Sequence, residues 1–195
     1  MVFGISNMGE KIQLGERRDK MIQRKIRLTP VLVLVGFVGI LAFLISSKVH
    51  ATQAPDIVSQ TWLNSKPLDL EQLRGKVVMV EFWTFGCWNC RNIEPYVKAW
   101  HEKYAKQGLV VIAVHSPEFK YEYDVEKVKD YIEEHGISYA VPIDNEFWNL
   151  RRYRNRYWPT LYLIDKQGTI QYTHIGEGGY EETEQAIQRL LAQPA

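Results

Sequence analysis

The sequence has few cysteines, little net charge and no internal repeat, and each shortage excludes a class of protein. Two cysteines in 195 residues exclude a small domain held together by several disulfides. Thirteen glycines and eight prolines without a period exclude a collagen-like fibre. With 46% hydrophobic residues and a formal net charge of +1, the chain as a whole is not disordered. Its length predicts one domain with a short additional segment.

The near-zero net charge is the sum of two unlike parts. Residues 1–50 contain eight Lys and Arg and three Asp and Glu, a net charge of +5. Residues 51–195 contain 16 Lys and Arg and 20 Asp and Glu, a net charge of −4. The basic N-terminal segment therefore differs in character from the acidic remainder.

Residues 28–47 are uncharged and include an unbroken run of apolar residues and glycine at 31–45. As a helix they would extend roughly 30 Å, the thickness of a bilayer's hydrocarbon core. Seven Lys and Arg precede the run, and Lys48 alone comes closely after it. The positive-inside rule then predicts a cytoplasmic basic segment at 1–27, a transmembrane helix at 28–47, and the rest on the extracytoplasmic side.

Two interpretations of this segment remain open, an uncleaved anchor and a cleaved secretory signal. Small residues around Ala51 would suit a signal peptidase. The long region before the apolar run favours the anchor, and both interpretations export the C-terminal remainder of the chain. The small and polar residues 48–58 are predicted to be a tether, and residues 59–195 to be the folded domain.

From Trp62 onward, strand-like and helix-like patterns alternate. Residues 76–83 form a nearly continuous β-branched and aromatic run, which is typical of a buried central strand. Further strands are predicted at 109–115, 160–164 and 169–175, and helices at 94–106 (beginning near Cys87), 125–134, 146–153 and 180–191. This order predicts an α/β fold with helices on both faces of a sheet.

The only two cysteines, Cys87 and Cys90, are three residues apart at the predicted start of a helix. They can form a disulfide across one turn, but a bridge that closes so short a loop adds little stability. A structural zinc site needs four ligands, and the histidines are scattered along the chain. The pair therefore indicates redox chemistry better than a structural disulfide or a metal site, and we expect no cofactor.

Cys87 is the expected nucleophile, because a helix N-terminus stabilises a thiolate and lowers its pKa below the free value of ~8.5. Cys90 would resolve the mixed disulfide. Glu81 precedes Cys87 by six residues, within the apolar strand. We expect it to accept the proton from Cys90, with a pKa raised by burial. The alternative is a glutamate that faces water at a strand edge.

The stretch Val80-Glu-Phe-Trp-Thr-Phe-Gly-Cys-Trp-Asn-Cys90 resembles the active-site sequence of the thioredoxin family. Pro95 resembles the family's helix-kinking proline, and Trp158-Pro159-Thr160 resembles its cis-proline loop. The resemblance implies a thioredoxin-like fold, a central mixed β-sheet flanked by helices. It also implies that Pro159 is cis beside Cys87 and that the backbone of Trp158 pairs with substrate. Trp88 is expected to be an exposed hydrophobic contact for substrate.

Within this family, residues 62–76 resemble the front hairpin of membrane-anchored TlpA/ResA-like thiol-disulfide oxidoreductases. The resemblance is strongest to the C-terminal thioredoxin-like domain of DipZ-type proteins and covers residues 56–192. It rests on Trp83-Thr84, Cys-x-Asn-Cys, and residues 155–159, 162–165 and 176–178. It implies an oxidoreductase that reduces protein disulfides, with apocytochrome c thiols or misoxidised exported proteins as targets. A separate membrane electron donor resembling CcdA or DsbD would recharge it.

Two other functions remain open. Thr84, three residues before Cys87, resembles the Thr-x-x-Cys of a peroxiredoxin-type thiol peroxidase, but Val80 stands where that family has proline. A non-catalytic interaction module is suggested by four arginines and two tyrosines at 151–157. That segment is either a solvated loop or a docking surface for an electron donor or substrate. Nucleic acid is not expected as a partner, because the exported domain is acidic.

Overall fold

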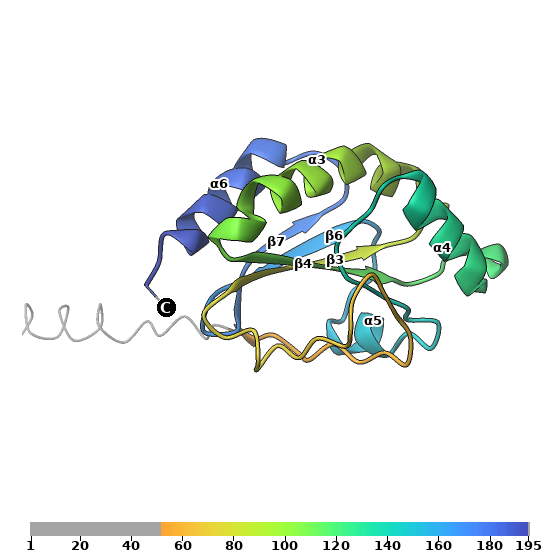
Figure 1. Cartoon of the computed structure of the whole chain (residues 1–195), viewed down its shortest axis with the longest axis horizontal. Coiled ribbons are helices and arrows are strands. Elements are labelled where there is room, and N and C mark those ends of the chain that lie inside the picture. The colour runs from red at the N-terminus through yellow and green to blue at the C-terminus, as the bar shows by residue number, and fades with distance from the viewer. Residues whose placement is uncertain (1–51, 195) are drawn as a thin grey trace, which may run out of the picture. The chain divides into compact units, whose positions relative to one another are not determined.

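A five-stranded sheet in the order β1-β7-β6-β3-β4 forms the centre of the computed structural model, which describes residues 52–194 (Figure 1). Its strands are β1 (Thr52–Gln53), β3 (Val77–Trp83), β4 (Leu109–His115), β6 (Thr160–Ile164) and β7 (Thr169–Ile175). β3 and β4 are parallel, and the other neighbouring strands are antiparallel. The prediction of a central mixed sheet is confirmed.

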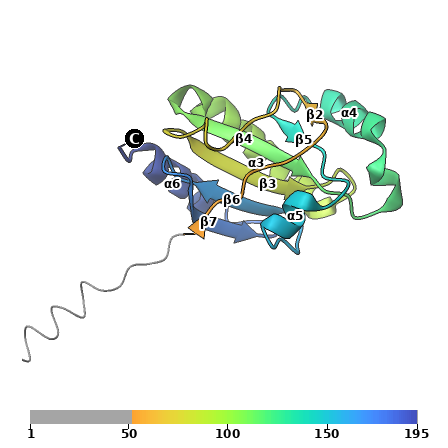
Figure 2. The same ribbon diagram turned by 90° about the horizontal axis from the view of Figure 1, so that it is seen from below.

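A second, two-stranded sheet joins β2 (Trp62–Leu63) to β5 (Val141–Pro142) in antiparallel register. Isolated bridges from β4 to Ala140 and Ile143 connect this pair to the free edge of the main sheet. Figure 2 shows β2 and β5 beyond β4, next to α4.

Helices cover both faces of the main sheet, as predicted. The helices are α3 (Trp88–Tyr104), α4 (Val125–Glu134), α5 (Trp148–Arg152) and α6 (Tyr180–Leu191), with 3-10 turns at Ala105–Gln107 and Lys120–Tyr123. Figure 1 shows α3 and α6 along one face, and α5 with the N-terminal part of the described chain on the other.

The side chains of β3 alternate between these two layers, because successive residues of a strand point to opposite faces. Val77, Met79 and Trp83 belong to the core beneath α3, α4 and α6. Val78, Val80 and Phe82 belong to the core on the α5 side. By the same period, Glu81 belongs to the α3 side of the sheet.

The predicted bounds of β4, α4, β6, β7 and α6 agree with the structure residue by residue. The front hairpin expected at 62–76 is wrong, because β2 pairs with β5, which lies far away in the sequence. Instead, residues 70–76 form consecutive turns, with backbone hydrogen bonds from Leu73 to Asp69 and from Lys76 to Leu73.

Residues 52–58, expected to be part of a tether, are packed into the domain. β1 pairs with β7, and Ile57 is buried in the core on the α5 side. The Val58 N–H donates to Asn149 Oδ1 at 2.8 Å. The domain therefore includes residues ahead of the predicted boundary at 59, since one apolar side chain and a few backbone hydrogen bonds attach an otherwise polar segment.

The predicted basic segment at 1–27 and the predicted membrane helix at 28–47 lie outside the described residues. Within residues 52–194, no helix is long and apolar enough to cross a membrane.

Candidate active site

The two cysteines form a disulfide where β3 leads into α3. Their Cα atoms are 5.3 Å apart. Cys87 is the N-cap residue of α3, and its Sγ accepts a hydrogen bond from the backbone N–H of Cys90 at 3.2 Å. A thiolate formed at Cys87 would therefore face a backbone donor and the positive end of the helix dipole. Cys87 is 8% exposed and Cys90 is 3% exposed, which suits Cys87 to external attack and Cys90 to resolution.

Glu81 lies in the middle of β3, opposite Ala113 on β4 and Leu161 on β6. It is 3% exposed, so the alternative of a glutamate that faces water is wrong. Burial, with a smaller contribution from the negative charge of Glu94, raises its pKa from 4.5 to about 8. The expected burial and raised pKa are confirmed, and the role in proton transfer stays a prediction.

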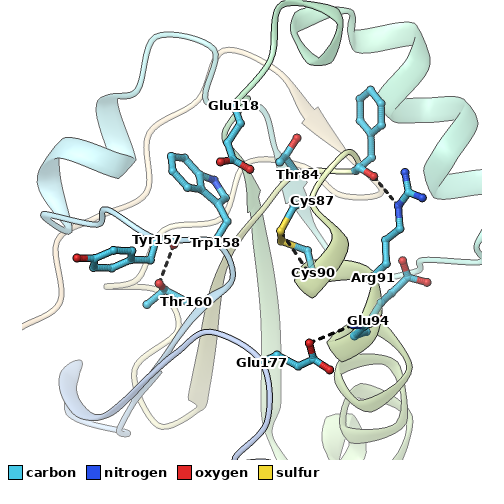
Figure 3. Close-up of a disulfide and its surroundings, with 12 residues drawn as sticks. Thr84, Cys87, Cys90, Arg91, Glu94, Glu118, Tyr157, Trp158, Thr160 and Glu177 are labelled. Carbon is cyan, nitrogen blue, oxygen red and sulfur yellow. Dashed lines mark hydrogen bonds between the residues drawn. A yellow bond between two sulfur atoms is a disulfide. The ribbon is translucent and has the colours of Figure 1, made fainter.

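Glu94, which the sequence analysis did not single out, forms a polar cluster behind the disulfide. Its Oε1 is 3.0 Å from His135 Nδ1, and its Oε2 accepts from the Tyr131 hydroxyl at 2.7 Å. Figure 3 shows Glu94 on the helix that begins at the disulfide. Its position four residues after Cys90, one turn along the same face of the helix, was the available signal. Its charge acts on the site by disfavouring ionisation of Glu81.

The peptide bond between Trp158 and Pro159 is cis, as the resemblance implied. The indole N–H of Trp158 donates to the backbone carbonyl of Ser116 at 3.0 Å, which fixes the ring. Figure 3 shows Trp158 and Glu118 on one side of the disulfide and Arg91 on the other. Trp88 is 72% exposed, so its side chain is available to a partner. That Trp158, Pro159 and Trp88 bind substrate stays a prediction.

Thr84 lies in the turn before Cys87, but its hydroxyl is directed elsewhere. Its Oγ1 is hydrogen-bonded to His115 Nε2 at 3.1 Å, and both residues are fully buried. Burial lowers the pKa of His115 to about 3, so the ring is neutral at physiological pH. The pair holds the end of β3 against the end of β4 and leaves the sulfur of Cys87 without a hydroxyl donor from Thr84.

Glu122 is a second buried carboxylate that the sequence analysis missed. Its Oε2 accepts from the backbone N–H groups of Glu118 and Phe119, at 2.7 and 2.9 Å. Its side chain lies directly against Gly86, the residue before Cys87. A Cβ at Gly86 would overlap Glu122 and the hydroxyl of Tyr121, so the close approach requires glycine.

Replacing Gly86 with alanine should therefore lower the free energy of unfolding by about 1–3 kcal/mol and slow the reaction of Cys87. The added methyl group has to displace the buried carboxylate or the backbone of the active-site turn. Urea unfolding and the rate of Cys87 alkylation in the reduced protein measure the two effects. In a Tyr121→Phe background, which removes one overlapping atom, the cost should be smaller; an undiminished cost would contradict the steric explanation.

Within residues 52–194, no group of three or more His, Cys, Asp or Glu side chains is arranged to hold a metal ion.

The sequence model of the AhpC/TSA family matches residues 51–173, more than half of the chain. The chain belongs to the AhpC/TSA family. Protein DipZ of Mycobacterium bovis is 44% identical to this family member over 142 residues, which are 71% of this chain and 20% of DipZ. The thiol-disulfide oxidoreductase YkuV of Bacillus subtilis is 31% identical over 141 residues, 71% of this chain and 94% of YkuV.

Solved structures agree with this membership. The crystal structure of a thioredoxin-like superfamily protein is 26% identical, with a TM-score of 0.69 over 74% of this chain and 99% of that one. This AhpC/TSA domain therefore has the thioredoxin-like fold that the sequence predicted. It spans about a fifth of the length of DipZ.

Proposed function

We propose that this AhpC/TSA protein is a thiol-disulfide oxidoreductase that reduces disulfides in other proteins. The observation that carries the proposal is the Cys87–Cys90 disulfide at the N-terminus of α3, with Cys87 the more exposed sulfur. The cis peptide bond of Trp158-Pro159, with Trp158 on one side of the disulfide in Figure 3, and the buried Glu81 complete the site. The name of YkuV supports the same reaction class.

The reaction consists of two exchanges that balance in electrons. In the reduced protein, the Cys87 thiolate attacks one sulfur of a substrate disulfide, forms a mixed disulfide and expels the other substrate sulfur as a thiolate. The Cys90 thiolate then attacks the sulfur of Cys87 and expels the second substrate thiolate. The substrate gains two electrons, and the protein is left with the Cys87–Cys90 disulfide. Glu81, in its ionised form, accepts the proton that Cys90 loses before the second attack.

The location of the protein, its electron donor and its substrates are also proposals. Residues 28–47 would anchor the protein in a membrane and place the domain on the extracytoplasmic side, which the basic residues before the apolar run support. A separate membrane protein resembling CcdA or DsbD would return the two electrons. Disulfide-bonded apocytochrome c, whose thiols would be regenerated, or misoxidised exported proteins would be the substrates.

A peroxiredoxin-type peroxidase is the second candidate, because Thr84 precedes Cys87 by three residues. The geometry favours it less, since the Thr84 hydroxyl is engaged by His115. Peroxide consumption by the wild type that is lost in Cys87→Ser would restore this candidate.

The reduction potential of the Cys87–Cys90 couple tests the proposed direction of electron flow. We expect a value near or below about −250 mV, on the reducing side of the thioredoxin-like scale. The full-length protein is equilibrated against glutathione and dithiothreitol buffers, and the thiols are trapped and counted. A value near about −120 to −180 mV would instead indicate a disulfide-forming or isomerising protein. If the two cysteines form no reversible redox couple, the remaining interpretation would be a non-catalytic interaction module.

A further inference from the structure

A groove lies between Trp158 of the cis-proline loop, the segment 117–119 and α5. Its volume is about 520 Å³, large enough for a bulky side chain with part of its backbone. Its apolar wall is formed by five residues, Pro117, Phe119, Phe147, Leu150 and Trp158. Trp158, which lies on one side of the disulfide in Figure 3, also lines the groove, so the residue before the cis-proline relates the groove to the active site.

The apolar wall is partly open to solvent: Pro117 is buried, and Phe147, Leu150 and Trp158 are half-buried. Phe119 is 52% exposed, although it is stacked on Tyr121 at a centroid distance of 5.9 Å. The ring of Trp158 is held in place by its hydrogen bond to Ser116. An exposed apolar wall with a fixed orientation is typical of a binding site, because it needs no rearrangement before a partner's side chain enters.

The charge around the groove is unevenly distributed. Arg151 lines the groove on α5, and Glu118 lines it beside Trp158. Arg152, Arg154 and Arg156 come next in the chain, and no acidic residue occurs between Glu146 and Asp165. None of the ion pairs within residues 52–194 includes any of these four exposed arginines. A basic segment without an ion-paired carboxylate among residues 52–194 thus begins at the groove, in a domain whose net charge is −4.

The conformation of this segment presents the arginines outward. The helix α5 ends with Arg154 in a left-handed conformation at φ 53°, a position usually taken by glycine or asparagine. The Asn155 N–H closes the end of the helix by donating to the Leu150 carbonyl at 2.9 Å. Tyr153 and Asn155 are buried, so the segment is attached to the domain while the arginines before, between and after them remain exposed.

We propose that the groove and its arginines bind an acidic segment of the disulfide-bearing substrate protein. An apolar side chain near the substrate cysteine fills the groove between Phe119, Leu150 and Trp158. Neighbouring Asp or Glu residues face Arg151 and the three arginines after it. This inference rests on the proposed function and adds to it a substrate class, cysteines flanked by apolar and acidic residues.

Short peptides test the proposal directly. Each carries one cysteine as a mixed disulfide with 2-mercaptoethanol, which adds no charge. One peptide has leucine and two aspartates beside the cysteine, the second has leucine and two lysines, and the third has alanine and two aspartates. Reduced full-length protein is mixed with each peptide, and the rate of the first exchange is followed by tryptophan fluorescence.

The aspartate–leucine peptide should react roughly tenfold faster than the lysine peptide at low ionic strength, because opposite charges accelerate encounter. In 1 M salt the ratio should fall toward one, since the Debye length is then only about 3 Å. The alanine peptide should react more slowly than its leucine counterpart at both ionic strengths.

Charge reversal at the groove should change this selectivity. Arg151→Glu should bring the aspartate-to-lysine ratio to one or below, and Arg154→Glu/Arg156→Glu provides a second variant if the first does not fold. Arg189→Glu, an exposed site on α6, is the matched control and should keep the wild-type ratio.

The same ratio in the wild type and in both groove variants would overturn the proposal. Equal rates with all three peptides would also overturn it and would point to an electron donor as the partner of the arginines. Failure to reduce any peptide, or the uncharged hydroxyethyl disulfide, would overturn the proposed function itself.

Discussion

Replacing Glu81 with glutamine should make the domain more stable at pH 8 and remove much of the pH dependence of its stability. The pKa of Glu81 is about 8 in the folded protein, against an ordinary value of 4.5. Between these pH values the folded state holds a proton that the unfolded state has lost. The free energy of unfolding therefore falls as the pH rises, by about 1.4 kcal/mol per unit. The destabilisation caused by ionising the buried Glu81 is absent below pH 4.5 and reaches about 5 kcal/mol above pH 8.

Urea unfolding of the oxidised full-length protein at pH 5, 6.5 and 8 measures this difference. The quantity of interest is the wild type minus Glu81→Gln, since other groups titrate in both proteins. Glu133→Gln, at an exposed position on α4, is the matched control and should parallel the wild type. Parallel curves for the wild type and Glu81→Gln would show that burial does not raise the pKa of Glu81.

The same variant also separates a catalytic role of Glu81 from a structural one. If the carboxylate accepts the proton of Cys90, the release of substrate from the mixed disulfide should accelerate as the pH rises through about 8. In Glu81→Gln this inflection should disappear and the step should slow by roughly 10²-fold or more. An unchanged pH profile would leave Glu81 with an effect on stability alone.

Replacing either cysteine should stop turnover, but at different steps. Cys87→Ser should lower the rate of substrate reduction by roughly 10³-fold or more, about 4 kcal/mol of activation free energy, because the attacking thiolate is gone. Cys90→Ser should still complete the first exchange and then accumulate as a mixed disulfide, since nothing remains to attack the Cys87 sulfur. The difference results from position: Cys87 caps α3 and is the more exposed, whereas Cys90 lies within the helix.

Intact-mass spectrometry of each variant, after reaction with a cysteine-containing peptide disulfide, measures the adduct. Cys90→Ser should gain the mass of one half of the substrate disulfide, and dithiothreitol should remove it. Cys87→Ser should gain nothing over the same time. An adduct that forms on Cys87→Ser instead would reverse the assigned roles, and equal adducts on both would show that the helix N-terminus does not distinguish the two sulfur atoms.

The elements whose bounds were predicted correctly are those that local sequence specifies. β6 and β7 are separated by a turn at 165–168, where Asp165 accepts backbone hydrogen bonds from Gln167 and Thr169. The helix α4 begins where Asp124 accepts from the Glu126 N–H, and the chain continues through Gly136 at φ 60°. Residues four or fewer apart make these interactions, so they can be recognised without the fold.

The errors lie where distant segments meet. β2 pairs with β5, which lies far along the chain. Ile57 is buried in a core formed with residues of β3 and β4 and with Tyr153, which follows α5. Nothing in the sequence near residue 57 distinguishes a packed segment from a tether. Glu122 was missed for the same reason, because only the folded chain brings it against Gly86.

The sequence by itself determined the cysteine pair and its place at a helix N-terminus, because two cysteines three residues apart follow a buried strand directly. It also determined the cis-proline loop through the resemblance to its family. Only the tertiary structure decided that Glu81 is buried with a pKa of about 8, that Glu94 adds to that shift, and that Arg151 borders a groove together with Trp158. The pKa of a carboxyl group and the shape of a groove depend on which distant side chains exclude water, and packing alone determines this.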